Sequence, residues 1–305
     1  MDYFSGMKED GYSLAMCFGE VLFDLFPTGP QPGGAPLNVA VQLQNLGIST
    51  TIISAIGNDN YGRQLTSFLQ EKKVNTDLLQ VINGKDTGTV RVNVDRNGDP
   101  TYTIIEGVAW DFIDDSFLKE DIQAKYLIHG SLACRSVASQ ASLEKLIKST
   151  QAKVVFDLNI RSPFYSKSLI DNLLSSAHIV KMSEEEFDML KRWYYIKNSR
   201  EVADLRALKY LFENLEIILV TKGNKGAIAW QGGKVATQKS IPVKTVDTVG
   251  SGDAFLSAFL SKYDQQLPLK ECLEFAVAAG TFLATKEGAN PVYAENDIRE
   301  LYAKK

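Results

Sequence analysis

The sequence predicts an α/β protein in which a mostly parallel sheet lies between helices, with a small β-sheet at its edge. Strand-like and helix-like segments alternate through most of the chain, which is typical of a parallel sheet covered by helices. Residues 216–220, Glu-Ile-Ile-Leu-Val, are almost entirely apolar, as expected of a strand buried on both faces. Two stretches, 20–32 and 87–111, contain strand-like residues without helices to cover them, and they predict the small sheet.

Local patterns predict the individual elements in order. Apolar residues recur at helical spacing between residues 38 and 46, and Gly47 follows at the position where a helix C-terminus favours glycine. The β-branched run 50–56 predicts the next strand. Further strands are expected at 126–129, 153–156, 178–181 and 216–220, and further helices around 143–147, 169–174, 184–190 and 273–283. The last of these helices is rich in alanine and contains Gly280, which favours close packing against a flat ligand.

The small sheet is expected to form a discontinuous lid on the main domain. Residues 89–94 alternate in the manner of a strand, and Asn97-Gly98 favours a tight hairpin turn before the return strand. We therefore expect an α/β domain over 13–305, a lid built from about 20–32 and 87–111, and a loose tail at 1–12. Such a lid can exclude water from reactive phosphates. The alternatives are a purely structural sheet or a contact in a homodimer.

Charge and cysteine content exclude several classes of function. The net charge of −4 argues against nucleic acid or an anionic membrane as the main partner, because phosphate-binding surfaces need a basic excess. The three cysteines are far apart, which favours reduced, buried thiols in the cytoplasm over a disulfide framework. No apolar run approaches the length of a membrane span, and the first residues lack the pattern of a secretion signal.

A glycine-rich turn at residues 250–252 is the strongest sign of chemistry. A short strand is expected at residues 245–246, and helical spacing begins at Ala254, so the turn opens a helix. Glycines let backbone N–H groups converge, and a helix N-terminus adds partial positive charge, which together make an anion site. Asp253 lies in the first turn and can accept the proton of a substrate hydroxyl. The alternative is that Asp253 only caps the helix.

Residues 247–253, Asp-Thr-Val-Gly-Ser-Gly-Asp, resemble the C-terminal signature of the ribokinase-like, or PfkB, carbohydrate kinases, Asp-Thr-x-Gly-Ala-Gly-Asp. Ser251 stands where alanine is commoner, a change that keeps the backbone donors. The resemblance implies that Asp253 is the catalytic base. It also implies that Gly250, Ser251 and Gly252 form the anion hole.

The N-terminal half carries the expected sugar site. Residues 33–40 resemble the family's Gly-Gly-x-x-x-Asn-x-Ala element, in which Gly33 and Gly34 allow close approach of the sugar and Asn38 offers a donor and an acceptor to hydroxyls. Capping of the following helix is an equal alternative for Asn38. Residues 19–24 resemble the family's first strand, whose final Asp24 bonds sugar hydroxyls. A carboxylate in an apolar run is costly without partners, which favours a functional role for Asp24.

Residues 157–161, Asp-Leu-Asn-Ile-Arg, match the family form Asp-x-Asn-x-Arg and end a buried strand, where open α/β sheets bind ligands. Arg161 is a candidate for contact with the sugar or the transferring phosphate, and a surface salt bridge is the alternative. On the nucleotide side, residues 220–226 look like the family's ATP loop, and residues 286–289 resemble the segment that closes the adenine pocket. The implied cofactor-binding residues are Thr221, Lys222, Gly223, Gly226, Gly288 and Ala289.

Metal binding is implied for two acidic residues. Residues 181–186 resemble the family's Asn-x-x-Glu motif, with Ser183 in place of the asparagine, and Glu186 would help to place Mg²⁺ through water. The alternative is a solvated acidic first turn. Asp247, with its neighbours to residue 249 and the segment 286–289, is implied to help hold a monovalent cation such as K⁺.

The resemblance covers residues 14–291 and implies an ATP-dependent sugar kinase with the ribokinase-like fold. The motifs look most like those of fructokinases, so we expect the γ-phosphate of ATP to pass to a primary hydroxyl of D-fructose, giving fructose 6-phosphate. Ribose, 2-keto-3-deoxygluconate and nucleosides stay open as acceptors. A sugar or nucleotide sensor without activity is disfavoured because Asp253 is present. A homodimer formed through the lid is a further expectation.

Overall fold

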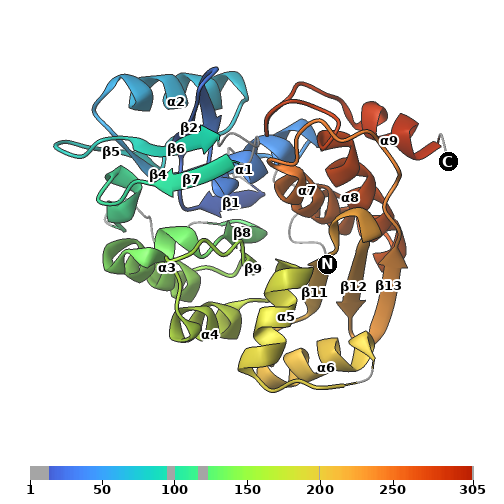
Figure 1. Cartoon of the computed structure of the whole chain (residues 1–305). Coiled ribbons are helices and arrows are strands. Elements are labelled where there is room, and N and C mark those ends of the chain that lie inside the picture. The colour runs from blue at the N-terminus through green and yellow to red at the C-terminus, as the bar shows by residue number, and fades with distance from the viewer. Residues whose placement is uncertain (1–13, 95–99, 116–122, 199, 304–305) are drawn as a thin grey trace.

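A nine-stranded sheet forms the centre of the part of the chain that the computed structural model describes, residues 14–94, 100–115, 123–198 and 200–303 (Figure 1). Its strand order is β13-β12-β11-β10-β9-β8-β1-β4-β5, and every pair from β5 to β11 is parallel. The hairpin of β12 and β13 continues the sheet in antiparallel fashion. The strands are β1 (Ala15–Phe18), β4 (Thr50–Gly57), β5 (Leu79–Ile82), β8 (Tyr126–His129), β9 (Lys153–Asp157), β10 (Ile179–Ser183), β11 (Ile217–Thr221), β12 (Ala227–Gln231) and β13 (Lys234–Gln238).

Helices cover both faces of this sheet, which confirms the predicted fold class. Alternate residues of β1 show the division, because successive side chains of a strand point to opposite faces. Ala15 and Cys17 pack with α1, α2, α7, α8 and α9, whereas Met16 and Phe18 pack with α3, α4, α5 and α6. The helices are α1 (Ala35–Asn45), α2 (Asn60–Glu71), α3 (Val137–Ser149), α4 (Lys167–Ser176), α5 (Glu184–Trp193), α6 (Glu201–Leu211), α7 (Ser251–Asp264), α8 (Leu269–Leu283) and α9 (Glu295–Ala303).

A second sheet of four strands lies beside the main one in the described residues, in the order β3-β2-β6-β7 (Figure 1). Both stretches of chain expected to supply it contribute, as β2 (Leu22–Phe26) with β3 (Gly29–Gly33) and β6 (Gly88–Val94) with β7 (Pro100–Ile104). The pair β2–β6 is parallel and the other two are antiparallel. The expected turn at Asn97-Gly98 and the tail 1–12 lie outside the described residues.

The side chain of Asp59 ties the second sheet to the main domain. It caps α2 by accepting a hydrogen bond from the N–H of Gly62, at 2.7 Å. The same carboxylate accepts from the N–H and the hydroxyl of Thr87, both at 2.7 Å. Because Thr87 directly precedes β6, one carboxylate fixes both the start of a helix and the point where the chain enters the second sheet.

Two local expectations are wrong. The end of the stretch 87–111 is not strand, since Ala109–Phe112 form a 3₁₀ helix. Residues 245–246 form no strand either, and the chain is irregular from 239 to the turn at 249–250. There it leaves the sheet, and the N–H groups of Val246 and Asp247 donate instead to the carbonyl of Ala284 just after α8, at 2.8 and 3.3 Å. The β propensity of two residues is outweighed because no neighbouring strand is available to pair with them.

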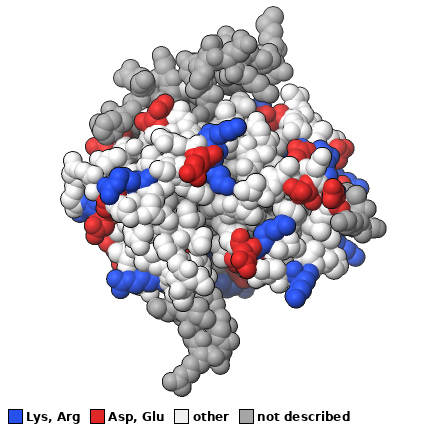
Figure 2. All heavy atoms as spheres, turned by 90° about the horizontal axis from the view of Figure 1, so that it is seen from above, with Lys and Arg blue, Asp and Glu red and all other residues white. Residues whose placement is uncertain are grey.

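The three thiols are buried, as the sequence predicts. Cys17, Cys134 and Cys272 are all free and buried. On the face shown in Figure 2, acidic and basic side chains of the described residues lie intermingled. In the described parts of the chain, no helix has the length and apolar character that crossing a bilayer requires.

Candidate active site

Asp253 lies at the start of α7, where the glycine turn meets the carboxyl edge of the parallel sheet. Gly250 precedes the helix in a left-handed conformation, with φ 75°, which favours glycine. A Cβ atom at Gly250 would also lie 2.7 Å from the Cβ of Ala289. The sequence therefore needs glycine at this point for two reasons, conformation and space. The consequence is that the first turn of α7 presents Asp253 to the interior, where only 8% of the residue is exposed.

The carboxylate of Asp253 is held by an amide from the opposite end of the sequence. Asn38 Nδ2 donates to Asp253 Oδ2 at 2.8 Å. Asn38 lies within α1, which begins at Ala35, so it does not cap that helix. Burial raises the pKa of Asp253, while the charges of Lys181 and Arg161 and the hydrogen bond from Asn38 oppose that rise. The two residues that the sequence assigned to different subsites are thus in direct contact.

Lys181 is the buried cation of this site, and the sequence alone did not single it out. The register of β9 and β10 places Lys181 beside Asp157, and its Nζ lies 3.0 Å from both oxygens of that carboxylate. A Cβ atom at Gly252 would lie only 2.9 Å from the same Nζ, so the ammonium group sits directly against the glycine turn. Burial lowers the pKa of Lys181, but the carboxylates of Asp157, Asp253 and Glu186 outweigh it and raise the pKa. A lysine inside an apolar strand was the available signal.

The second sheet supplies a further carboxylate. Asp24 of β2 is half-buried, and burial raises its pKa to about 6 against the opposing charge of Arg161. A Cβ atom at Gly33 would overlap Asp24 Oδ2, so the glycine leaves that oxygen open. Gly34, with φ 106°, has no room for a side chain either, because a Cβ would overlap the backbone of Glu20. Arg161 is exposed after β9, and its charge acts on both Asp24 and Asp253.

Sequence reasoning missed two further groups near Asp253 and Asp24. Glu20 is 2% exposed, and its Oε2 has no hydrogen-bond partner among the described residues. Burial raises the pKa of Glu20 to about 7, with Arg161 opposing and Asp253 adding to the rise. Tyr102 of β7 is 51% exposed, and burial together with the charges of Asp24 and Asp247 raises the pKa of its hydroxyl. A glutamate directly after a buried strand was the only sequence signal for Glu20.

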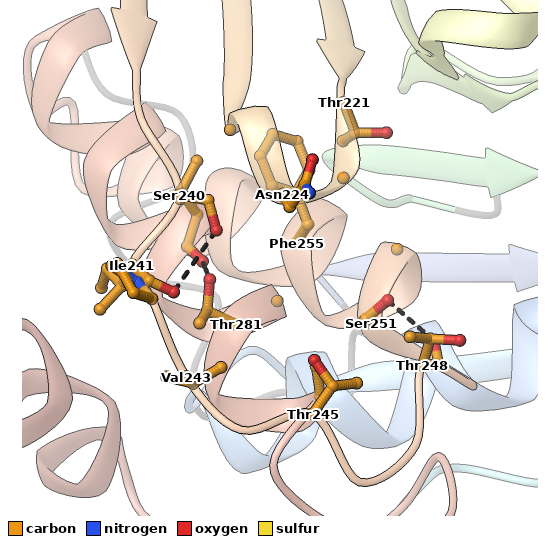
Figure 3. A pocket seen from close by; sticks show the side chains of 17 residues that line it. Thr221, Asn224, Ser240, Ile241, Val243, Thr245, Thr248, Ser251, Phe255 and Thr281 are labelled. Atoms are coloured by element: carbon orange, nitrogen blue, oxygen red, sulfur yellow. Dashed lines mark hydrogen bonds between the residues drawn. The ribbon is translucent and has the colours of Figure 1, made fainter.

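A cavity of about 410 Å³ lies on the other side of the glycine turn (Figure 3). Five expected residues line it, namely Thr221 at the end of β11, Gly223 and Gly226 after it, and Ser251 and Gly252 at the start of α7. The remaining wall comes from the irregular segment 240–248, from Asn224 and Phe255, and from the small residues of α8 and its end, Gly280, Thr281 and Ala284. An anionic group bound in this cavity beside Ser251 and Gly252 would lie at the N-terminus of α7.

Three expected residues of this cavity do not line it. The Nζ of Lys222 lies 2.5 Å from Glu201 of α6, so its side chain is used in an ion pair. Gly288 donates its N–H to Asp247 Oδ2 at 3.1 Å, and Ala289 packs against Gly250. The segment 286–289 therefore supports the glycine turn from behind rather than forming the cavity wall.

The two carboxylates implied for metal binding are both held by backbone N–H groups. Glu186 accepts from Ile160 and from Ser183, each at 2.7 Å, and Ser183 caps α5 in return. Asp247 accepts from Gly288. Each carboxylate oxygen keeps a second lone pair, so these groups fit an ion that retains much of its water shell, as Mg²⁺ does. Among the described residues, no group of three His, Cys, Asp or Glu side chains could hold a metal ion by itself.

The sequence of this chain is similar to those of known proteins. A sequence profile of the pfkB family carbohydrate kinases matches residues 13–296. Fructokinase-2 of Solanum habrochaites is 30% identical over 310 residues, covering 91% of this chain and 92% of that protein.

Solved structures share the fold over nearly the whole chain. A fructokinase of Xylella fastidiosa with bound ATP has a TM-score of 0.85 at 22% identity, covering 96% of this chain and 99% of that one. A protein of E. coli described as ribokinase II, in complex with ATP and Mg²⁺, has a TM-score of 0.84 at 22% identity, covering 96% and 100%. A fructokinase of Vibrio cholerae O395 with fructose, ADP and calcium bound has a TM-score of 0.81 at 26% identity, covering 96% and 99%.

Proposed function

Because this chain belongs to the pfkB family of carbohydrate kinases, and is thus a phosphotransferase with an alcohol acceptor, we propose that it phosphorylates D-fructose with ATP. The product is fructose 6-phosphate, formed at the primary hydroxyl. One observation carries the proposal: a buried carboxylate, Asp253, lies beside a helix N-terminus and a buried ammonium group, Lys181. Fructose is favoured because relatives named fructokinases match over nine-tenths of the chain.

Asp253 is the general base in this proposal. Its carboxylate accepts the proton of the attacking hydroxyl as the oxygen bonds to the γ-phosphorus, and the bond to the bridging oxygen of ATP breaks, releasing ADP. The donor from Asn38 at 2.8 Å keeps the carboxylate oriented and favours its ionised form. Burial acts in the opposite direction, so the proton affinity of the base is a balance between these two effects.

The negative charge on the transferring phosphoryl group is stabilised by backbone donors and a lysine that are fixed in the folded protein. The N–H of Ser251 donates to the carbonyl of Thr248 at 3.2 Å, so Gly250 and Gly252 carry the backbone donors that stay unpaired within the described residues at this turn. An anion there is stabilised by these donors and by the helix dipole. Lys181 lies against Gly252 and adds a full positive charge. Asp157 orients the ammonium group at 3.0 Å. This arrangement can stabilise the transition state without reorganisation, because the Lys181–Asp157 pair is buried and the glycine turn is held in place by its backbone.

The sugar is proposed to bind between the second sheet and the carboxyl edge of β9. Asp24 and Arg161 present an acceptor and donors to sugar hydroxyls, and Gly33 and Gly34 leave room for the ring. Tyr102 of β7 is placed to cover the sugar from the second sheet, which then acts as a lid.

ATP is proposed to occupy the cavity of Figure 3, with its phosphates toward Ser251 and Gly252. Glu186 would hold Mg²⁺ through water, and the ion would supply positive charge toward the phosphates. The contact of Asp247 with Gly288 joins the two segments proposed to hold a monovalent cation such as K⁺.

The decisive test measures ADP formation by the purified protein with Mg²⁺, K⁺ and a panel of acceptors. Turnover on fructose alone is the expected result. Preferred turnover on ribose, 2-keto-3-deoxygluconate or a nucleoside would replace the acceptor while keeping the chemistry. Binding of these ligands without any turnover would instead favour a sensor.

The variant Asp253→Asn isolates the base. The amide oxygen that it introduces still accepts the hydrogen bond from Asn38 and preserves the fold, but the new side chain cannot take a proton. We expect kcat to fall by a factor of about 10³ or more, with the dissociation constant of ATP changed by less than about threefold. Calorimetric titration with ATP is the control, and wild-type turnover in this variant would refute the assignment of Asp253.

A homodimer formed through the second sheet stays a prediction. The apolar side chains of Val90 and Val92 are only 5% and 4% exposed, so the apolar area left for a partner on β6 is small. Light scattering of the purified protein would give its mass in solution.

A further inference from the structure

The side-chain amide of Asn38 is used at both ends within the protein. Its Nδ2 donates to Asp253 Oδ2, and its Oδ1 accepts from Asn290 Nδ2, both at 2.8 Å. Asn38 itself is 5% exposed. Asn290 comes from the segment that follows α8, so three residues from three distant parts of the chain form one hydrogen-bonded series.

The direction of this series is fixed by the charge at its end. A carboxylate can only accept hydrogen bonds, so the amide of Asn38 must turn its NH₂ group toward Asp253. Its oxygen then faces Asn290, which must in turn present an NH₂ group. With the donor end of Asn290 used in this way, its Oδ1 is left buried and without a partner among the described residues. Leaving this oxygen unpaired costs free energy of folding. The orientation of Asn290 therefore serves its hydrogen bond to Asn38 rather than its own pairing.

The segment that carries Asn290 is anchored independently on both sides. Gln42 Nε2 donates to the carbonyl of Ala289 at 2.7 Å, and the hydroxyl of Tyr293 donates to Gln42 Oε1. These contacts hold the backbone near α1 without involving the amide of Asn290. The hydrogen bond from Asn290 to Asn38 is therefore not needed merely to close the loop.

We propose that Asn290 is a positioning residue that sets the orientation of the Asn38 amide and thereby holds the base Asp253 ready to accept a proton. The inference rests on the proposed role of Asp253. The other charges that act on this carboxylate are Lys181 of β10 and Arg161 after β9, while Glu20 and Asp157 are the acidic groups coupled to it. None of these four contacts Asn290 through a hydrogen bond in the described residues, so a change at Asn290 acts through Asn38.

The variant Asn290→Asp tests the proposal. A carboxylate at 290 has nearly the same shape but cannot donate, so the Asn38 amide turns over and presents its oxygen to Asp253. Loss of the hydrogen bond to a charged acceptor raises the pKa of the base. We expect the apparent pKa of the acid limb of the kcat/KM profile to rise by about one pH unit. At pH values below that pKa, kcat/KM should then be about tenfold lower than in the wild type. The uncharged variant Asn290→Ala should shift this pKa in the same direction by less.

Two controls separate this effect from loop damage and from the added charge. Tyr293→Phe removes the neighbouring anchor but leaves the series intact, and its pH profile should match the wild type. In an Asn38→Ala background, Asn290→Asp should shift the limb by less than a third of its effect in the wild type. A wild-type profile for Asn290→Asp, an equal shift in Tyr293→Phe, or a full shift in the Asn38→Ala background would each overturn the proposal.

Carboxyl-carbon NMR titration of Asp253, assigned with Asp253→Asn, gives the same comparison without any acceptor sugar. An upward shift of the Asp253 pKa in Asn290→Asp supports the series even if fructose is not the substrate. An unchanged pKa refutes it even if fructose turnover is confirmed. The failure of the proposed substrate and the failure of this inference are thus distinguishable.

Discussion

Individual buried charges determine what the site can do, and Lys181 shows this most directly. Its ammonium group serves two partners, since it neutralises Asp157 and lies against the glycine turn. A cation with a single structural role would need only the first contact. Removing it should therefore have separable consequences for stability and for turnover.

We predict that Lys181→Met lowers stability by about 3–5 kcal/mol, because Asp157 is left buried and unpaired. It should also lower kcat by a factor of about 10² or more through loss of charge stabilisation. The double variant Lys181→Met/Asp157→Asn removes the orphaned charge and should recover most of the stability but not kcat. Urea unfolding and steady-state kinetics measure the two effects. Recovery of kcat in the double variant would mean that Lys181 acts only on the fold.

Sequence reasoning predicts roles for residues in a distinctive local context, and it missed the contacts that strand register defines. Asp253 is recognisable because it follows a glycine turn that opens a helix. Lys181 gains its meaning only when β10 lies beside β9, and the pairing of Asn38 with Asn290 joins positions 252 residues apart. No local pattern reports such contacts, so the pairing of Lys181 with Asp157 and that of Asn38 with Asn290 could not be predicted from the sequence.

Among the elements, the start of α7 depends on its contact with the segment after α8. Gly250 needs both a left-handed conformation and space beside Ala289, whereas Gly47 after α1 has a similar φ of 80° but no atom within 4 Å of a Cβ position. The two glycines therefore form a matched pair, in which only Gly250 lacks space for a side chain.

We predict that Gly250→Ala and Gly47→Ala each lose about 1–2 kcal/mol from the left-handed conformation. Only Gly250→Ala should also displace the first turn of α7 and lower kcat, by about tenfold or more, because a misplacement of about 1 Å is costly at a reacting centre. Thermal unfolding and kinetics of both variants test this. Equal kinetics in the two variants would show that the glycine turn tolerates movement.

The apolar strands and the helices with clear periodicity could be predicted, because the pattern of consecutive apolar residues indicates which side chains are buried. The irregular segment 239–250 could not, since two of its backbone donors, on Val246 and Asp247, pair with the carbonyl of Ala284 at a distant helix end. The same segment forms much of the cavity wall in Figure 3, which explains why that part of the site was missed.

At the scale of the whole molecule, buried acids set the pH dependence of stability. Glu20 has a folded pKa of about 7 and Asp24 of about 6, each above its ordinary value because of burial. The unfolded chain therefore loses these protons at lower pH than the folded protein does. Stability falls as pH rises through this range, and it is fully retained only below the unfolded pKa values.

We predict that Glu20→Gln removes a substantial part of this dependence, while the raised pKa of Asp157, about 7, stays in place. The variant should gain up to about 3 kcal/mol over the wild type at about pH 8 and nothing near about pH 4, from a shift of roughly 2.5 pKa units. Chemical unfolding at several pH values measures the difference. Glu71→Gln on the exposed end of α2 is the matched control, and it should leave the free energy of unfolding unchanged at each pH. A gain for Glu20→Gln that is equal at all pH values would show that packing, not ionisation, is responsible.

The strand order has a consequence for synthesis on the ribosome. β1 leaves the tunnel first but lies between β4 and β8, so its second neighbour appears only when residue 129 has been made. The partner of Asn38 is synthesised later still, because Asp253 follows it by 215 residues. A nascent chain released early could bury much of the sheet but would lack the acceptor for the proton. With Asp253 as the proposed base, we expect chains that end before residue 253 to consume no ATP.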